Sequence, residues 1–208
     1  MSIITLPAGF RVPAGCTIGQ QRYDMTESSD TTGDEAARLL GPPRWSMSLR
    51  SVDALTLIEA GLWESVVLKL RGRVNHLAMY DPVRSAPQGT LRGTPTLDAT
   101  VGAGVSVIVL TGVSTGRTLL PGDWLQIGTG VGTSQLIKVV EAATESGGKL
   151  TTTFEPPLRT GYTAGAAITW DKPVAYFKQA GNPQWGYRPA PVYRATAYTI
   201  DLLESWTP

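Results

Sequence analysis

Only one stretch of this chain carries a helical repeat, and the sequence around it has the pattern of strands and turns. Apolar residues recur at intervals of three and four between positions 55 and 70, which predicts one helix over roughly 52–68. The stripe consists of Leu55, Ile58, Leu62, Val66 and Leu70, widened by Trp63 and Val67. Ser51 or Asp53 can cap its start, and Gly72 can end it. With few charges of its own, this helix is expected to pack on a sheet.

Strands are predicted on both sides of the helix. Residues 44–50 alternate strictly, with Trp45, Met47 and Leu49 on one face. Another strand is expected at 74–80, followed by a long turn over 81–89 that two prolines and a glycine fix. Short strands separated by Gly/Thr turns follow at 105–110, 123–128, 135–141, 149–155 and 166–170, and longer ones at 173–179 and 192–204.

Composition agrees with a mainly β fold. Glycine and proline together make up 38 of the 208 residues, and charged residues are only 17%, against roughly 25% in typical domains. We therefore expect a mainly β chain: a β-sandwich hub domain with one α-helix, interrupted by a small antiparallel β-barrel or sandwich. The predicted hub comprises 19–92 plus 172–208, and the insert comprises 93–171. Residues 1–18 are expected to form an extended arm, and the acidic stretch 24–35 a solvated loop.

Several function classes are disfavoured. A net charge of +1 argues against a nucleic-acid binder. The single cysteine, Cys16, allows no intramolecular disulfide, and a metalloenzyme or a histidine-based triad would depend on His76 alone. The N-terminus lacks a basic signal-peptide region, and no apolar run is long enough for a membrane span. We expect a soluble protein made in a reducing cytoplasm, without cofactor or metal.

The candidate chemical sites each have a simpler structural interpretation. His76 could be a catalytic base, but no Gly-x-Ser-x-Gly frame accompanies it. The glycines at 128, 130 and 132 fit neither phosphate-binding pattern, so a hairpin tip is favoured. Trp124 and Trp170 could stack on a sugar, although a core position is expected for Trp124. Glu141 and Glu155 could form a glycosidase pair only if the fold brings them together.

A loose basic group remains, and we interpret it as a contact between subunits. With Asp81, it supplies the predicted interface residues Arg71, Arg73, Arg84 and Arg92.

Four segments, in order, resemble the distal tail proteins of long-tailed phages (siphophages). The first two are the central stretch of 63–64, 70–82 and 87–90, and residues 122–128, GDWLQIG. The others are residues 155–159, EPPLR, and the closing strand 197–204, AYTIDLLE. The resemblance covers about 45–204.

The resemblance implies a non-enzymatic virion protein of the tail tip. Members of that family form a homohexameric ring that joins the tail tube protein to the tip or baseplate hub protein, near the tape-measure protein. They assemble in the host cytoplasm, without a membrane or a specific nucleic-acid contact. Their inserted β domain projects outward, and some relatives carry a larger, sugar-binding insert. A carbohydrate-binding module used in host recognition is the alternative, and a hydrolase is a further rival class.

Overall fold

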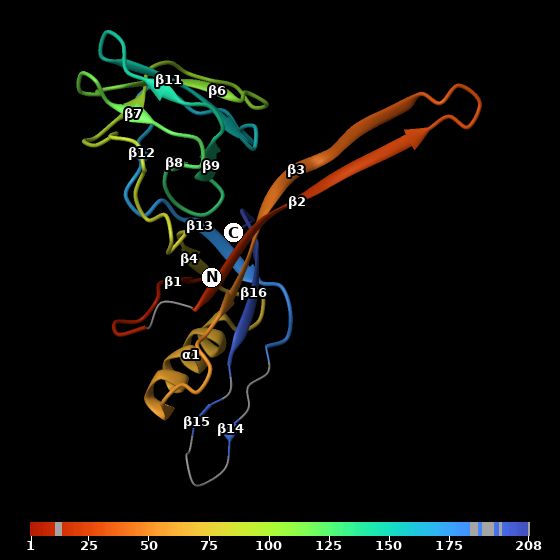
Figure 1. Cartoon of the computed structure of the whole chain (residues 1–208), viewed down its shortest axis with the longest axis vertical. Helices are drawn as coiled ribbons and strands as arrows, with labels where there is room; N and C mark the ends of the chain where they lie inside the picture. The colour runs from red at the N-terminus through yellow and green to blue at the C-terminus, as the bar shows by residue number, and fades with distance from the viewer. Residues whose placement is uncertain (11–13, 184–186, 189–193, 196, 208) are drawn as a thin grey trace.

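The chain is mainly β with a single helix among its described residues, which confirms the predicted fold class. The computed structural model describes residues 1–10, 14–183, 187–188, 194–195 and 197–207. Figure 1 shows a lower body built on α1, an upper body of short strands, and a long ribbon that projects to one side. Each body has its own buried apolar cluster.

The lower body is a six-stranded sheet in the order β1-β4-β13-β16-β3-β2. Its strands pair antiparallel except β1, which runs parallel to β4. The strands are β1 (Ile3–Ile4), β2 (Gly15–Ser28), β3 (Glu35–Arg50), β4 (His76–Met79), β13 (Ala175–Gln179) and β16 (Thr199–Glu204). Alternation along β3 and β16 directs Met47, Leu49, Ile200 and Leu202 into the core.

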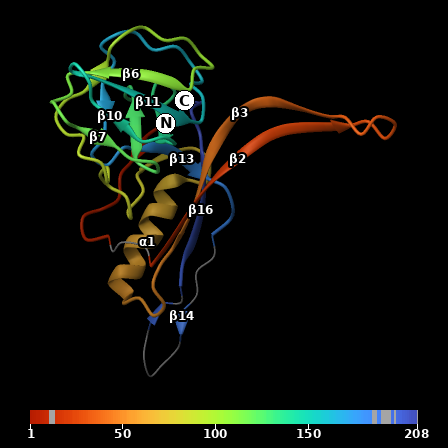
Figure 2. The same ribbon diagram turned by 45° about the horizontal axis from the view of Figure 1, so that its top comes forward.

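Helix α1 (Leu57–Leu70) lies against this core, as Figure 2 shows. It begins later than predicted, because Thr56 rather than Ser51 or Asp53 caps it in a capping box with Glu59. It ends at Arg71, whose left-handed conformation satisfies the last turn, with Gly72 next. The buried face comprises Ala60, Trp63, Val66, Val67 and Leu70.

Part of the predicted apolar stripe was wrong. Ile58 is 82% exposed and Leu62 only half-buried. The buried face is instead the one that carries Trp63, whose ring contacts the rings of Phe10 and Tyr198.

The upper body is a second six-stranded sheet in the order β12-β8-β9-β11-β6-β5. A bridge between Thr96 and Ala167 joins its two edge strands, so the sheet is nearly closed. Its strands are β5 (Thr96–Leu97), β6 (Val107–Thr111), β8 (Trp124–Ile127), β9 (Gln135–Val139), β11 (Lys149–Glu155) and β12 (Ile168–Thr169). A separate pair, β7 (Thr118–Leu119) and β10 (Ala143–Thr144), lies beside it.

The division into a hub of 19–92 plus 172–208 and an insert of 93–171 stays a prediction. The two clusters do not follow it at every residue, because Leu91 belongs to the upper core while Trp124 and Leu136 belong to the lower one. The strand expected at 192–204 is described only as β15 (Arg194–Ala195) and β16, with β14 (Tyr187–Arg188) pairing to β15. Residues 192, 193 and 196 lie outside the described part.

The projecting ribbon corrects one expectation in part. β2 and β3 pair from Gly15↔Arg50 to Ser28↔Glu35, so the acidic stretch 24–35 is the end of a long hairpin. Residues 24–28 belong to β2 and Glu35 begins β3, and only residues 29–34 form the expected loop. Cross-strand pairing holds it rather than burial, which is why no apolar alternation marked it. The extended arm expected over 1–18 stays a prediction. Ile4, Leu6 and Phe10 pack on the lower core, and Gly15 onward forms β2.

Candidate functional site

The most elaborate side-chain arrangement lies where the two bodies meet, and we call it the joint. It has two clusters: Asp81, Arg84, Asp123 and Trp124 in the first, and Trp45, Arg159, Glu204 and Trp206 in the second. Most of these side chains are buried or half-buried, although several of them are charged.

Asp123 anchors the chain that enters the upper body. It stands between the Pro-Gly turn and β8 and is buried. Its carboxylate accepts hydrogen bonds from the backbone N–H groups of Gln88 (2.7 Å), Gly89 (3.1 Å) and Leu120 (2.8 Å). These are charge-assisted bonds in a buried site, which makes them strong. The approach is close: a Cβ on Gly89 would collide with the backbone of Thr118.

Asp81 holds the turn after β4 against the same strand. One carboxylate oxygen accepts from the N–H groups of Val83 and Arg84, and the other accepts from the indole N–H of Trp124 at 3.0 Å. Arg84 donates in turn to the carbonyl of Gly122 at 3.0 Å. The turn at 81–84 is thus bonded to Gly122, just before β8, and to Trp124, the first residue of β8.

The rings of Trp45 and Trp124 bring β3 of the lower body into contact with β8 of the upper body. They meet edge to face with centroids 4.8 Å apart, and the Trp45 indole donates to the carbonyl of Leu136 at 2.9 Å. The ammonium of Lys138 lies over the Trp124 ring at 4.5 Å. Burial, and then the nearby Arg84, lower the pKa of Lys138, while Asp81 opposes them.

The second cluster is a buried ion pair. Arg159 bonds Glu204 at 3.2 Å and the carbonyl of Ser134 at 2.7 Å, and the two charged side chains are 7% and 5% exposed. The other oxygen of Glu204 accepts from the backbone N–H of Trp45. Burial raises the pKa of Glu204, and the hydrogen bond from Trp45 and the charge of Arg159 only partly offset it.

Contacts between arginine side chains and aromatic rings connect this ion pair to the ribbon. The Arg159 guanidinium lies 4.1 Å from the centroid of the Trp206 ring, and that of Arg44 lies 4.5 Å from the same ring. Arg44 also stands 5.8 Å from the centroid of Tyr23. The upper body, the C-terminal segment and the base of the ribbon are therefore linked by one set of contacts. The arrangement holds parts together, and it presents no nucleophile with an adjacent base.

The predicted interface residues occur in two different surroundings. Asp81 and Arg84 belong to the joint, and Arg92 donates to the carbonyl of Gly89 while lying over the Trp170 ring. Arg71 and Arg73 are exposed just after α1. The side chains of Asp81, Arg84 and Arg92 thus make contacts within the chain. Those of Arg71 and Arg73 lie on the surface.

The structure also shows where the other candidate residues from the sequence lie. His76 is buried on β4, where its backbone N–H donates to Ser2, and burial followed by the charge of Lys178 lowers its pKa. Trp124 is a core residue, as expected. Trp170 donates to the carbonyl of Gly93. Residues 128–132 connect β8 to β9, which confirms the hairpin tip.

Glu141 accepts a hydrogen bond from Thr153, while Glu155 ends β11. Among the described residues, no three His, Cys, Asp or Glu side chains gather as a metal site. No described helix has the length and apolar character needed to cross a membrane.

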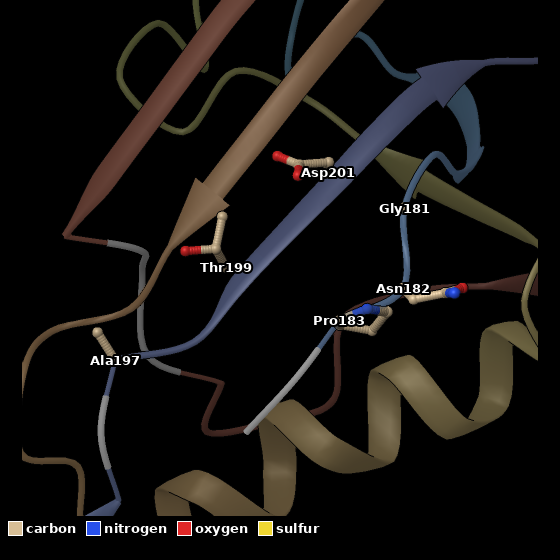
Figure 3. A pocket seen from close by; sticks show the side chains of 6 residues that line it. All are labelled: Gly181, Asn182, Pro183, Ala197, Thr199 and Asp201. Carbon is tan, nitrogen blue, oxygen red and sulfur yellow. The ribbon is translucent and has the colours of Figure 1, made fainter. Parts of the chain in front are cut away.

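An open groove of about 300 Å³ lies beside the start of β16. It is lined by Gly181, Asn182, Pro183, Ala197, Thr199 and Asp201. Figure 3 shows that its polar side chains point in different directions and do not converge on one place. Asp201 already accepts a hydrogen bond from Ser48 at 2.7 Å. Nothing in this lining selects a ligand.

Sequence reasoning missed Asp123, Arg159 and Glu204. The available signal was an aspartate directly before a buried strand, and a glutamate at an inward position of the last strand. Their partners lie between 3 and 159 positions away in the chain, so spacing alone could not pair them.

In comparisons with known proteins, no family model matches this chain, and no curated protein matches it either.

Proposed function

We propose that this chain is a structural virion protein that forms a hexameric ring at the distal end of a phage tail. The ring joins the tail tube protein to the tip or baseplate hub protein, close to the tape-measure protein. The upper body, which contains the insert, projects outward. The protein assembles in the host cytoplasm and performs no catalysis. The number six comes from the family resemblance.

The observation that supports this proposal best is where the four resembling segments lie. The central stretch supplies Asp81, the GDWLQIG segment supplies Asp123 and Trp124, EPPLR supplies Arg159, and the closing strand supplies Glu204. All five residues belong to the joint. Each of the four segments therefore contributes at least one residue to the contacts between the two bodies, which supports the hub-and-insert architecture that the resemblance implies.

The projecting ribbon favours an assembled state. An isolated two-stranded ribbon is marginally stable in water, and its strand edges carry unpaired backbone groups. All residues from 24 to 38 are exposed. A head-to-tail contact that covers such an element closes into a ring when the rotation that relates neighbouring copies closes.

Imaging of intact tails tests the proposal. An epitope inserted at the exposed turn 147–148 of the upper body should be labelled at the tail end, with rotational symmetry about the tail axis. The same epitope on a major capsid protein is the control for labelling elsewhere. Density for this chain in the capsid, or without rotational symmetry at the tail, would overturn the proposal.

The two alternative functions, sugar binding and hydrolysis, can each be tested separately. Trp124 is inaccessible for stacking, and Trp170 already carries Arg92 on its ring. A glycan array with wild-type protein would detect a carbohydrate-binding module. Turnover that a His76→Ala variant abolishes would indicate a hydrolase.

A further inference from the structure

The charges of this nearly neutral chain are segregated on its surface. We call residues 24–38 the acidic arm, because they carry five carboxylates and one arginine. The carboxylates are Asp24, Glu27, Asp30, Asp34 and Glu35, and all are exposed. Asp24 pairs with Arg22 at 3.0 Å, whereas the other four form no ion pair within the described chain.

A surface of opposite charge follows helix α1. We call residues 68–74 the basic turn, since Lys69, Arg71 and Arg73 are all exposed there and no acidic residue lies among them. Backbone bonds from Arg71 to Leu68 and from Val74 to Arg71 hold it compact. Arg73 donates to the carbonyl of Ala180, and none of the three cations forms an ion pair with a described residue.

Both surfaces also expose apolar side chains. Leu68 is 63% exposed and Val74 49% exposed in the basic turn, and Met25 is 47% exposed on the acidic arm. An apolar centre surrounded by complementary charges is the usual composition of a specific protein–protein contact.

The acidic arm cannot satisfy the basic turn of its own chain. Figures 1 and 2 both show the ribbon leading away from α1. The ribbon beyond Tyr23 extends for roughly 20 Å at the usual rise per strand residue. We infer that the acidic arm of one copy docks on the basic turn of a second copy. This inference rests on the proposed function, because it assigns the head-to-tail contact of the ring.

Complementary charge reversal tests the contact. The arm variant carries Asp30→Lys, Asp34→Lys and Glu35→Lys, and the turn variant carries Arg71→Glu and Arg73→Glu. When two copies of the same variant meet, the arm of one copy then faces a turn of like charge on the other, so self-association should weaken about tenfold or more. An equimolar mixture should regain it, because every arm then meets a turn of opposite charge. Arg50→Glu, at an exposed pair with Asp53, is the matched control and should associate like wild type.

Association is measured by sedimentation across protein concentrations, with thermal unfolding of each variant to confirm that it folds. A carbodiimide cross-link detects weak contacts directly. In a mixture of isotope-labelled and unlabelled wild-type protein, Lys69 of one copy should become joined to an arm carboxylate of another. The yield should fall as salt is raised.

Three outcomes would overturn the inference. The first is that the mixture of arm and turn variants associates no better than either variant alone. The second is that each variant by itself associates as strongly as wild type. The third is that the arm carboxylates cross-link only to surfaces other than the basic turn. Rings that persist in both reversal variants would reject this contact and leave the proposed function standing. Absence of the protein from the tail end would reject the proposed function, while the mixing result would still report whether the copies join through these surfaces.

Discussion

The joint and the acidic arm both depend on charged residues, but they use them in opposite ways. At the joint, carboxylates and guanidinium groups are buried or half-buried, and each has hydrogen-bond partners within the chain. On the arm, the carboxylates are exposed and most form no described ion pair. The comparison indicates that the internal charges fix the shape of this chain, whereas the exposed charges of the arm are, in our proposal, the ones that contact a second copy.

The joint and the arm also differ in the free-energy cost of removing the partners of a carboxylate. A buried carboxylate that loses its partners carries the full cost of desolvation, while an exposed one returns to water at little cost. Substitutions at the joint should therefore reduce folding stability. Substitutions on the arm should leave stability nearly unchanged and reduce association.

The largest effect is expected at Asp123. Replacing Asp123 by Ala removes the acceptor of three backbone N–H groups in a buried site, so the free energy of unfolding should fall by about 4 kcal/mol. Asp30→Ala on the arm is the matched control and should change it by less than about 0.5 kcal/mol. Urea unfolding followed by tryptophan fluorescence measures both. Similar losses in the two variants would remove the distinction between joint and arm.

The ion pair provides the next comparison. Arg159→Met leaves Glu204 buried without its counter-charge, so we expect a loss of about 3 kcal/mol. Arg22→Met breaks the exposed pair with Asp24 and should cost less than about 1 kcal/mol. Adding Glu204→Gln to Arg159→Met should recover part of the loss. If the double variant is less stable than the single one, unpaired charge is not the cause.

A third comparison uses two glycines. A Cβ at Gly89 would collide with the Thr118 backbone, so Gly89→Ala should cost about 2 kcal/mol through overpacking. Gly41, at the base of the ribbon, has no atom within 4 Å of a Cβ and no positive φ. Gly41→Ala should therefore be neutral or slightly stabilising. Thermal unfolding of both variants is the measurement, and a neutral Gly89→Ala would show that the contact can relax.

Local pattern predicted the regular elements of the fold well. The alternation at 44–50, the helical repeat near 55–70 and the short strands after 93 are all present. Burial of one face produces such periodicity, so a single sequence is enough to detect it. The helix start was displaced because several polar residues, Ser51, Asp53 and Thr56, could each serve as a cap.

The joint and the ribbon were beyond such reasoning for physical reasons. Asp123 and Glu204 are satisfied by groups distant in the chain, and no local repeat records that pairing. The acidic arm is exposed on both faces, so it lacks the alternation that marks a half-buried strand. Its acidic composition suggested a solvated loop, which is correct for its exposure and for the connection at 29–34 but wrong for the paired strand residues.

The smallest expected effect is the pH dependence that Glu204 gives to stability. Burial raises the pKa of Glu204 above its ordinary 4.5 in the folded protein. The folded state therefore holds this proton more tightly than the unfolded chain does. The contribution of Glu204 to stability is largest below pH 4.5 and is lost as pH rises through the raised pKa, with a slope of at most about 1.4 kcal/mol per pH unit.

Glu204→Gln keeps the size of the side chain and removes the titration, so the difference between wild type and variant should shift against wild type as pH rises from 4.5 toward neutral. Urea midpoints of the two proteins at several pH values measure this difference. Subtracting the variant cancels every other titrating group that behaves alike in both proteins. A constant difference across the range would mean that Arg159 and the N–H of Trp45 compensate the burial of Glu204 fully. A difference that shifts toward wild type would mean that they outweigh it, and the joint would then hold a stabilising ion pair rather than a costly one.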